Sequence, residues 1–85
     1  MKRTKGIPFS DFRRFLESLG FTYRQSNAAS VFGHPGEDLL VFRIYQKNEP
    51  VAGRDLLIAR KFLDLRGLLG SKDFEDFLQR TGTPA

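Results

Sequence analysis

The chain has 85 residues, the size of one small domain, and it contains no cysteine and a single histidine. These counts exclude a disulfide scaffold, a thiol nucleophile and a metal site built from Cys and His, so we expect neither a metal nor another cofactor. Fourteen Lys and Arg residues against ten Asp and Glu residues give a formal charge of +4, which favours a polyanionic partner such as nucleic acid.

The start of the chain is basic and contains Gly6 and Pro8, so residues 1–9 are expected to form a flexible basic arm. It lacks the apolar core of about 7–15 residues that a signal peptide needs, and no run approaches the roughly 18 apolar residues of a membrane span. The sequence therefore predicts a cytoplasmic protein that does not partner with a membrane.

A first helix is predicted to follow the arm. Ser10 can accept a hydrogen bond from a free N–H group of the first turn, and Asp11 suits the positive end of the helix dipole. Gly20 then ends the helix, because glycine adopts the left-handed conformation at little cost. Apolar residues at helical spacing form the stripe that faces the core: Phe12, Phe15, Leu16 and Leu19.

Three strands are predicted next. Residues 21–25 alternate apolar and polar side chains, and residues 30–34 do so less regularly, so the two form a hairpin joined by residues 26–29. Residues 35–38 have strong turn chemistry, and residues 39–45 are the most β-prone run of the chain. The expected product is a three-stranded antiparallel meander.

Two helices are predicted after the sheet. The second helix covers residues 54–66, where apolar side chains recur at helical spacing, and Gly67 ends it. Ser71 is expected to cap a short third helix, with Asp73 in its first turn. Residues 81–85 then form a tail.

These elements predict a single domain over residues 10–80. Two helices laid on one face of an antiparallel sheet bury both apolar stripes at once. The expected fold class is therefore α+β, a two-layer sandwich with a three-stranded antiparallel sheet and the order α-β-β-β-α-α. This is the architecture of double-stranded-RNA-binding domains.

Three stretches of the sequence carry a family resemblance. Residues 12–21, FRRFLESLGF, and residues 23–42, YRQSNAASVFGHPGEDLLVF, resemble the HicA family, small toxins of toxin–antitoxin pairs with the double-stranded-RNA-binding fold. Residues 54–78, RDLLIARKFLDLRGLLGSKDFEDFL, are similar to the closing part of that family. The resemblance spans roughly Ser10 to Leu78. It implies metal-independent cleavage or binding of messenger RNA, and inhibition by a partner antitoxin protein.

The sequence departs from the family at the residue that the resemblance makes catalytic. That residue is a histidine of the hairpin turn, three positions before an aromatic, which here is Phe32, so its place is taken by Ala29. The glycine and serine that usually precede it fall on Asn27 and Ala28. Cleavage without a metal needs a group that takes the proton of a 2′-hydroxyl, which imidazole does and a methyl group cannot. We therefore expect RNA binding without efficient nuclease activity.

Two alternatives stay open at this stage. His34 is the only imidazole that could replace the missing base, although its position before Pro35 at the end of a strand favours a structural role. An active mRNA interferase is thus the first alternative. The second is a protein-interaction module that binds an antitoxin-like partner through the exposed sheet or the first helix.

RNA is expected to bind a diffuse basic face. Strand alternation places Arg24 and Arg43 opposite the core, where they would follow phosphates together with Lys47. Ordinary charged surface and turn chemistry are the competing interpretations, and Tyr23 and Tyr45 are either stacking residues or core. The full set of candidate RNA contacts lies on strands, the hairpin loop and the second helix: Arg24, Ser26, Asn27, Arg43, Lys47, Arg54 and Lys61.

Overall fold

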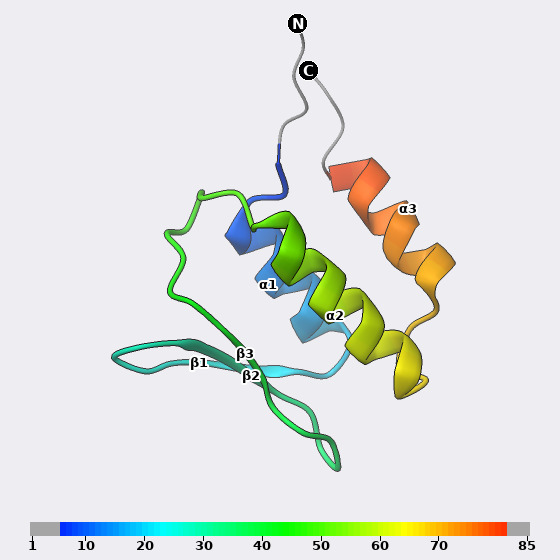
Figure 1. Ribbon diagram of the computed structural model, residues 1–85, viewed down its shortest axis with the longest axis horizontal. Coiled ribbons are helices and arrows are strands. Elements are labelled where there is room, and N and C mark those ends of the chain that lie inside the picture. The colour runs from blue at the N-terminus through cyan, green and yellow to red at the C-terminus, as the bar shows by residue number, and fades with distance from the viewer. Residues whose placement is uncertain (1–5, 82–85) are drawn as a thin grey trace, which may run out of the picture. The chain divides into compact units, whose positions relative to one another are not determined.

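The computed structural model describes residues 6–81, so the arm expected over residues 1–9 and the tail expected over residues 81–85 lie largely outside the described residues. The predicted α+β class, the order α-β-β-β-α-α and the three-stranded antiparallel sheet are confirmed (Figure 1). The elements are α1 (Phe9–Ser18), β1 (Thr22–Gln25), β2 (Ser30–Gly33), β3 (Leu40–Phe42), α2 (Gly53–Leu65) and α3 (Ser71–Thr81). The chain divides into two compact units, residues 8–49 and residues 50–81 with Gly6 and Ile7.

The start of α1 is held by main-chain acceptors. The helix begins at Phe9, and Pro8 occupies the cap position without a side-chain hydrogen bond. The N–H groups of Phe9 and Ser10 donate to the carbonyl oxygens of Glu49, at 2.9 Å, and Lys47, at 3.0 Å. The prediction that Ser10 caps the helix is therefore wrong, because the segment after β3 satisfies the free N–H groups of the first turn.

The end of α1 matches the prediction. Leu19 is the last residue before Gly20, which has a φ of +103°, a conformation that favours glycine. The Nε2 atom of His34 lies 3.1 Å from the carbonyl oxygen of Leu19, one of the acceptors that a helix end leaves free. The histidine thus ties the turn that follows β2 to the end of α1.

We expect Gly20→Ala to lower the free energy of unfolding by about 1–3 kcal/mol, because alanine is strained at this φ. A Cβ atom at this position would also lie 3.1 Å from Nε2 of His34. Gly70→Ala is the control, since its Cβ would meet no atom within 4 Å and its φ is not positive. Urea denaturation followed by circular dichroism measures both, and equal losses for the two variants would contradict this account of Gly20.

The sheet has the order β1-β2-β3 with antiparallel pairing throughout. Its last strand is shorter than the predicted run of residues 39–45, since β3 pairs with β2 only over residues 40–42. The chain leaves the sheet after Phe42 because residues 43–49 turn to bring their carbonyl groups to the start of α1. Arg43 therefore follows the strand and is not part of it.

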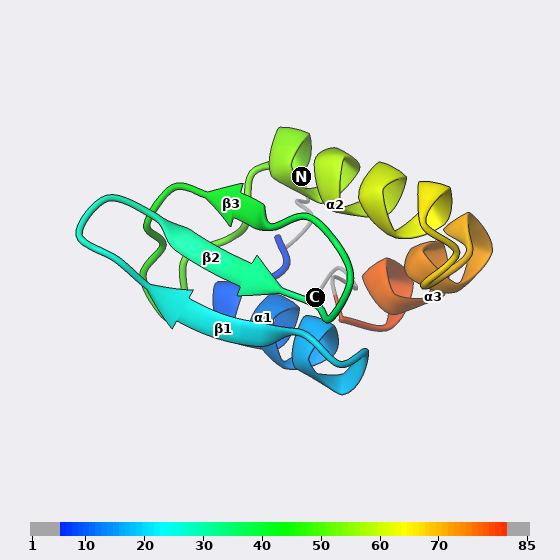
Figure 2. The same ribbon diagram turned by 90° about the horizontal axis from the view of Figure 1, so that it is seen from below.

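Aromatic rings join α1 to the sheet within residues 8–49. The helix lies across one face of the sheet (Figure 2). The Phe12 ring, which has no exposed surface, meets Phe32 and Phe42 edge to face at centroid distances of 6.0 and 5.7 Å. Such pairs stabilise a core beyond the area they bury. The expected stripe of α1 is buried at Phe12 and Leu16.

The unit of residues 50–81 is built on two helices. α2 and α3 contact one another, and the guanidinium of Arg60 on α2 lies 3.0 Å from the carboxylate of Glu75 on α3. Gly67 has a φ of +70° after α2, as expected of a helix end. Ser71 lies inside α3 as its first residue, so the expectation that it precedes the helix as a cap is wrong.

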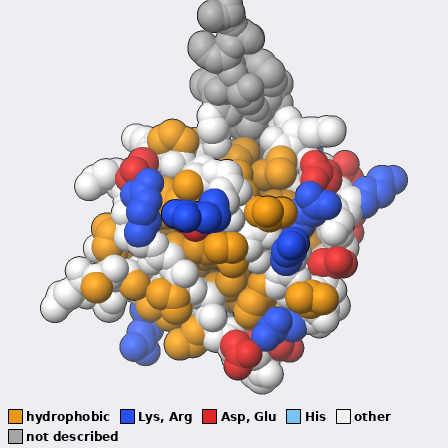
Figure 3. All heavy atoms as spheres, viewed as in Figure 1, with side chains coloured by type: hydrophobic (Ala, Val, Ile, Leu, Met, Phe, Trp, Pro, Cys, Tyr) orange, Lys and Arg blue, Asp and Glu red, His pale blue; other side chains and the backbone are white. Residues whose placement is uncertain are grey.

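Apolar side chains also reach the surface along α2 (Figure 3). Leu57 and Ile58 are each nearly half exposed, and Leu65 near the end of the helix is 80% exposed. None of the helices within residues 6–81 has the length and apolar character that crossing a membrane requires.

Candidate nucleic-acid interface

A groove of about 720 Å³ opens on the unit of residues 8–49, between α1, β1 and the segment that follows β3. The side of α1 contributes Ser10, Arg13, Arg14 and Glu17. These residues stand at positions i, i+3, i+4 and i+7, the spacing of one helical face, and they run beside the buried apolar stripe. The groove thus has a polar wall in which the helix geometry sets the positions of the charged side chains.

The floor of the groove is aromatic. Phe9 lies nearly parallel to Tyr45, with ring centroids 5.2 Å apart and planes at 10°, and it meets Tyr23 edge to face at 5.8 Å. Tyr45 is 6% exposed, so it belongs to the core as much as to the groove. The hydroxyl of Tyr23 donates to Oε1 of Gln25 at 3.3 Å, and the amide N–H groups of Gln25, which also lines the groove, take no part in this bond.

Two arginines lie over the two tyrosines. The guanidinium carbon of Arg13 is 4.3 Å from the centroid of the Tyr23 ring, and that of Arg43 is 3.9 Å from the centroid of the Tyr45 ring. Cation–π contacts of this kind contribute roughly 0.5–1 kcal/mol at exposed sites. Their larger consequence is orientation, because a stacked guanidinium loses little further freedom when it binds an anion.

Acidic neighbours pair with the arginines of α1. Arg13 lies 3.2 Å from Glu17, and Arg14 lies 2.7 Å from Asp11, with all four side chains substantially exposed. Exposed pairs of this kind contribute about 0–1 kcal/mol, so an incoming phosphate can displace them at little cost. Lys47 also lines the groove, and no carboxylate among the described residues lies within ion-pairing distance of its ammonium group.

Residues 43–49 form a strap along one edge of the groove. Arg43 contacts the carboxylate of Glu49 at 2.8 Å, and the N–H group of Gln46 donates to Oε1 of Glu49 at 2.9 Å. The hydrogen bond from Arg43, followed by that from Gln46, lowers the pKa of Glu49 below its ordinary value of 4.5. Glu49 therefore organises the strap in its ionised form.

The strap is expected to loosen at acidic pH. A carboxyl group whose pKa is lower in the folded state contributes stability above its unfolded pKa, and that contribution is lost as the pH falls through the folded value. For Glu49 this window lies below pH 4.5. The amide resonance of Gln46 should shift in that window in an NMR titration. The same resonance in Glu49→Gln should not titrate, and a titration that persists there would assign the shift to another group.

The hairpin loop between β1 and β2 is closed by its own serine. Oγ of Ser26 accepts from the N–H groups of Ala28, at 3.3 Å, and Ala29, at 3.1 Å, and the N–H group of Ser26 donates to the carbonyl oxygen of Ala29 at 2.9 Å. The hydroxyl is thus engaged in turn chemistry. Asn27 is exposed at the tip, and Ala29 presents a methyl group at the position that the family resemblance makes catalytic.

Ser30 follows the loop and carries a buried hydroxyl without a partner. The residue is 1% exposed, and its Oγ atom makes no hydrogen bond. Because an unpaired buried hydroxyl costs about 1–3 kcal/mol, we expect Ser30→Ala to raise the free energy of unfolding by up to about 1 kcal/mol. Ser26→Ala should lower it by roughly as much, since it removes the acceptor that closes the loop. Thermal denaturation of both variants checks these opposite signs.

His34 lies at the other end of β2 from this loop and is occupied by the main chain. Its Nε2 atom faces the carbonyl oxygen of Leu19 at 3.1 Å, and its Nδ1 atom faces that of Pro35 at 3.3 Å. A carbonyl oxygen can only accept, so Nε2 donates and cannot take a proton while this bond holds. The ring also meets Phe21 edge to face at 5.0 Å. All of these contacts are what is expected if His34 holds the turn after β2 in place and does not act as a base.

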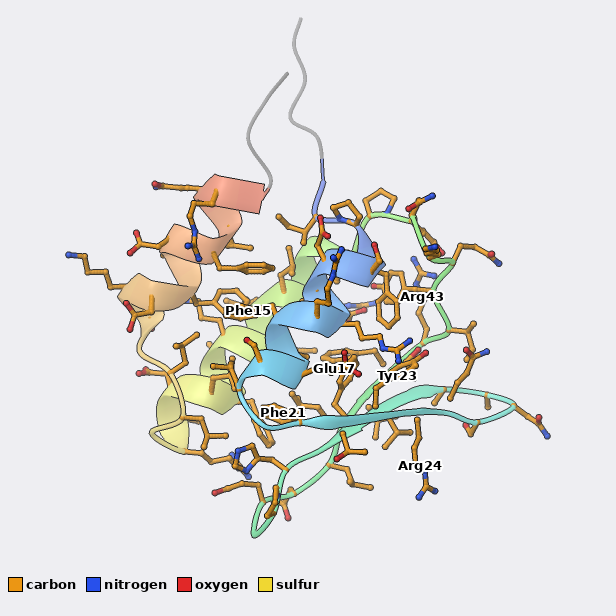
Figure 4. All side chains as sticks on the ribbon, turned by 180° about the vertical axis from the view of Figure 1, so that it is seen from behind. Phe15, Glu17, Phe21, Tyr23, Arg24 and Arg43 are labelled. Carbon is orange, nitrogen blue, oxygen red and sulfur yellow. The ribbon has the colours of Figure 1, made fainter. Side chains whose placement is uncertain are left out.

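The predicted basic residues do not form one face. Arg24 points away from the side of the sheet that carries α1, whereas Tyr23, Glu17 and Arg43 lie on the α1 side (Figure 4). Lys47 lies in the groove. The shared sheet face expected for Arg24, Arg43 and Lys47 is therefore divided, because β3 ends before Arg43.

The remaining predicted contacts lie in the other unit. Arg54 in the first turn of α2 and Lys61 two turns later are both exposed. Arg13 and Arg14 were not among the predicted RNA contacts. Their helical spacing with Ser10 and Glu17 was the feature of the sequence that indicated a shared polar face.

Within residues 6–81, no group of three or more His, Asp or Glu side chains is arranged to hold a metal ion. Comparisons of the chain with protein-family models, with curated proteins and with solved structures find no match.

Proposed function

We propose that the chain is an RNA-binding protein of the toxin–antitoxin type, similar to HicA toxins, which holds RNA in the groove beside α1 and has lost efficient strand cleavage. The observation that carries this proposal is the convergence of Arg13 and Arg14 from α1 and of Lys47 from the strap on one groove. Arginine and lysine at such a surface neutralise phosphates and release their counterions. The formal charge of +4 supports the same class of partner.

The polar groups of the groove favour RNA over DNA. Ser10, which has a hydroxyl, and Gln25, which has amide N–H groups, both line the groove. Both can hydrogen-bond a 2′-hydroxyl, which is the group that distinguishes RNA at a given position. Cleavage is left out of the proposal because Ala29 offers no base and His34, whose Nε2 atom donates to the carbonyl oxygen of Leu19, lies at the other end of β2.

Fluorescence anisotropy with a labelled single-stranded RNA of about 12 nucleotides tests the proposal. Three or four neutralised phosphates should give a slope of about −2 to −3 in a plot of log affinity against log salt concentration. DNA of the same sequence should bind several-fold more weakly. A flat salt response, or no binding at about 50 mM salt, would reject RNA binding through this groove.

A second function, the binding of a protein partner, is favoured by the outer face of the sheet. Leu39 and Val41 are 61% and 56% exposed there. Leu39, Val31 and Pro35 line a hollow of about 340 Å³ on this face. Arg24 borders the same hollow, and no acidic side chain among the described residues pairs with it. An antitoxin-like protein with acidic and apolar side chains would suit this face. The test is whether the parent chain co-purifies with the product of a neighbouring reading frame and whether Val41→Lys reduces that co-purification.

A further inference from the structure

Each of the two tyrosines of the groove has an arginine guanidinium over its ring. One face of Tyr45 is covered by Phe9, which lies stacked on it at 10°, and the guanidinium of Arg43 lies 3.9 Å from its centroid. Tyr23 is packed against Phe9 and Phe32, and Arg13 lies over its ring at 4.3 Å. A protein that stacks bases needs an open aromatic face. Over these two rings the position is taken by arginines: Arg13, which lines the groove, and Arg43, which lies at its edge.

The same contacts prepare the arginines for phosphate. A guanidinium is planar and binds a phosphate through two parallel N–H donors, provided that its plane is held in a fixed orientation. The rings of Tyr23 and Tyr45 supply that orientation. The carboxylates of Glu17, at 3.2 Å from Arg13, and Glu49, at 2.8 Å from Arg43, occupy the donor edges that a phosphate would take. In the binding step, phosphate groups of the RNA would replace the carboxylates of Glu17 and Glu49 on the two arginines.

We propose that Arg13 and Arg43 make the groove a reader of the sugar–phosphate backbone that is indifferent to base identity. This inference rests on the proposed RNA binding and names what is recognised. Each arginine has two roles in it: its donors bind phosphate oxygens, and its stacking excludes bases from the tyrosine beneath. The groove would accordingly accept a single RNA strand of any base sequence.

The test compares oligonucleotides of equal length that differ only in their bases. Oligo(U), oligo(A), oligo(C) and an abasic sugar–phosphate oligomer are titrated against the full chain by anisotropy at fixed salt. We expect affinities within about threefold of one another, because the contacts are to the backbone. A preference of more than about tenfold for one base, or loss of binding by the abasic oligomer alone, overturns the inference and leaves RNA binding intact. If none of the oligomers binds, both proposals fail together.

Two arginine variants distinguish the effect of covering a tyrosine ring from the effect of the positive charge. Arg13→Ala exposes the Tyr23 ring, so total affinity should fall while oligo(A) becomes preferred over oligo(U) by about fivefold or more, since purines stack better. Arg14→Ala removes the same charge, but no cation–π contact joins Arg14 to a ring within the described part of the chain, so it should weaken all oligomers equally. Equal behaviour of the two variants overturns the covering role. Both residues are exposed, and a thermal melt confirms that each variant is folded.

Discussion

Reversing the charges of Arg13 and Lys47 together is expected to weaken RNA binding by about 100-fold or more. Each residue lines the groove from a different segment, so the double variant removes two phosphate contacts and adds two repulsive carboxylates. A hydrogen bond to a charged group contributes about 1.5–3 kcal/mol, and 1.4 kcal/mol is a factor of ten in affinity. Anisotropy with single-stranded RNA at low salt measures the loss for Arg13→Glu with Lys47→Glu.

The matched control changes the formal charge by the same amount elsewhere. Arg24→Glu with Lys61→Glu also takes the chain from +4 to zero, but neither residue lines the groove. We expect this pair to weaken binding by less than about fivefold, through the long-range field alone. Similar losses for the two double variants would show that binding is a diffuse electrostatic effect, the distribution that the sequence alone had favoured.

The kinds of element and their order could be predicted because each has a local pattern. Helical spacing of Phe12 and Leu16 and the turn chemistry before β3 were sufficient for the α+β class. The cap of α1 could not be predicted, because its acceptors are the carbonyl groups of Lys47 and Glu49, more than thirty positions away in the sequence. A favourable cap residue such as Ser10 is a local preference that this distant segment overrides.

The same distant segment explains why the groove was missed. In the predicted strand over residues 39–45, Arg43 would lie on the outer face of the sheet. In the structure the strand ends at residue 42. Arg43 then stacks on Tyr45 at the margin of the groove. Arg13 and Arg14 were visible as a polar stripe, but nothing in the sequence indicated which tertiary neighbour that stripe would face. Sites of this kind depend on contacts between segments, which local periodicity does not encode.

Placing an imidazole at position 29 is expected to create ribonuclease activity. Ser26 holds the loop through the main-chain groups of Ala28 and Ala29, so a side-chain change there leaves its hydrogen bonds intact. No residue other than glycine has a positive φ among residues 6–81, so histidine is tolerated at this backbone position. A positioned general base contributes about 10²–10⁴ in rate, and we expect Ala29→His to cleave single-stranded RNA at least about 100-fold faster than the parent.

Two controls decide whether position matters in that result. Ala28→His puts the same imidazole one residue away on the exposed part of the loop and should stay at the background rate. His34→Ala should also leave the background unchanged, while it destabilises the fold through loss of the bond to Leu19. Labelled RNA is incubated with each protein in the presence of a metal chelator and resolved on a denaturing gel. If the parent cleaves and His34→Ala abolishes that cleavage, the proposed loss of nuclease activity is wrong, because His34 would then be the base.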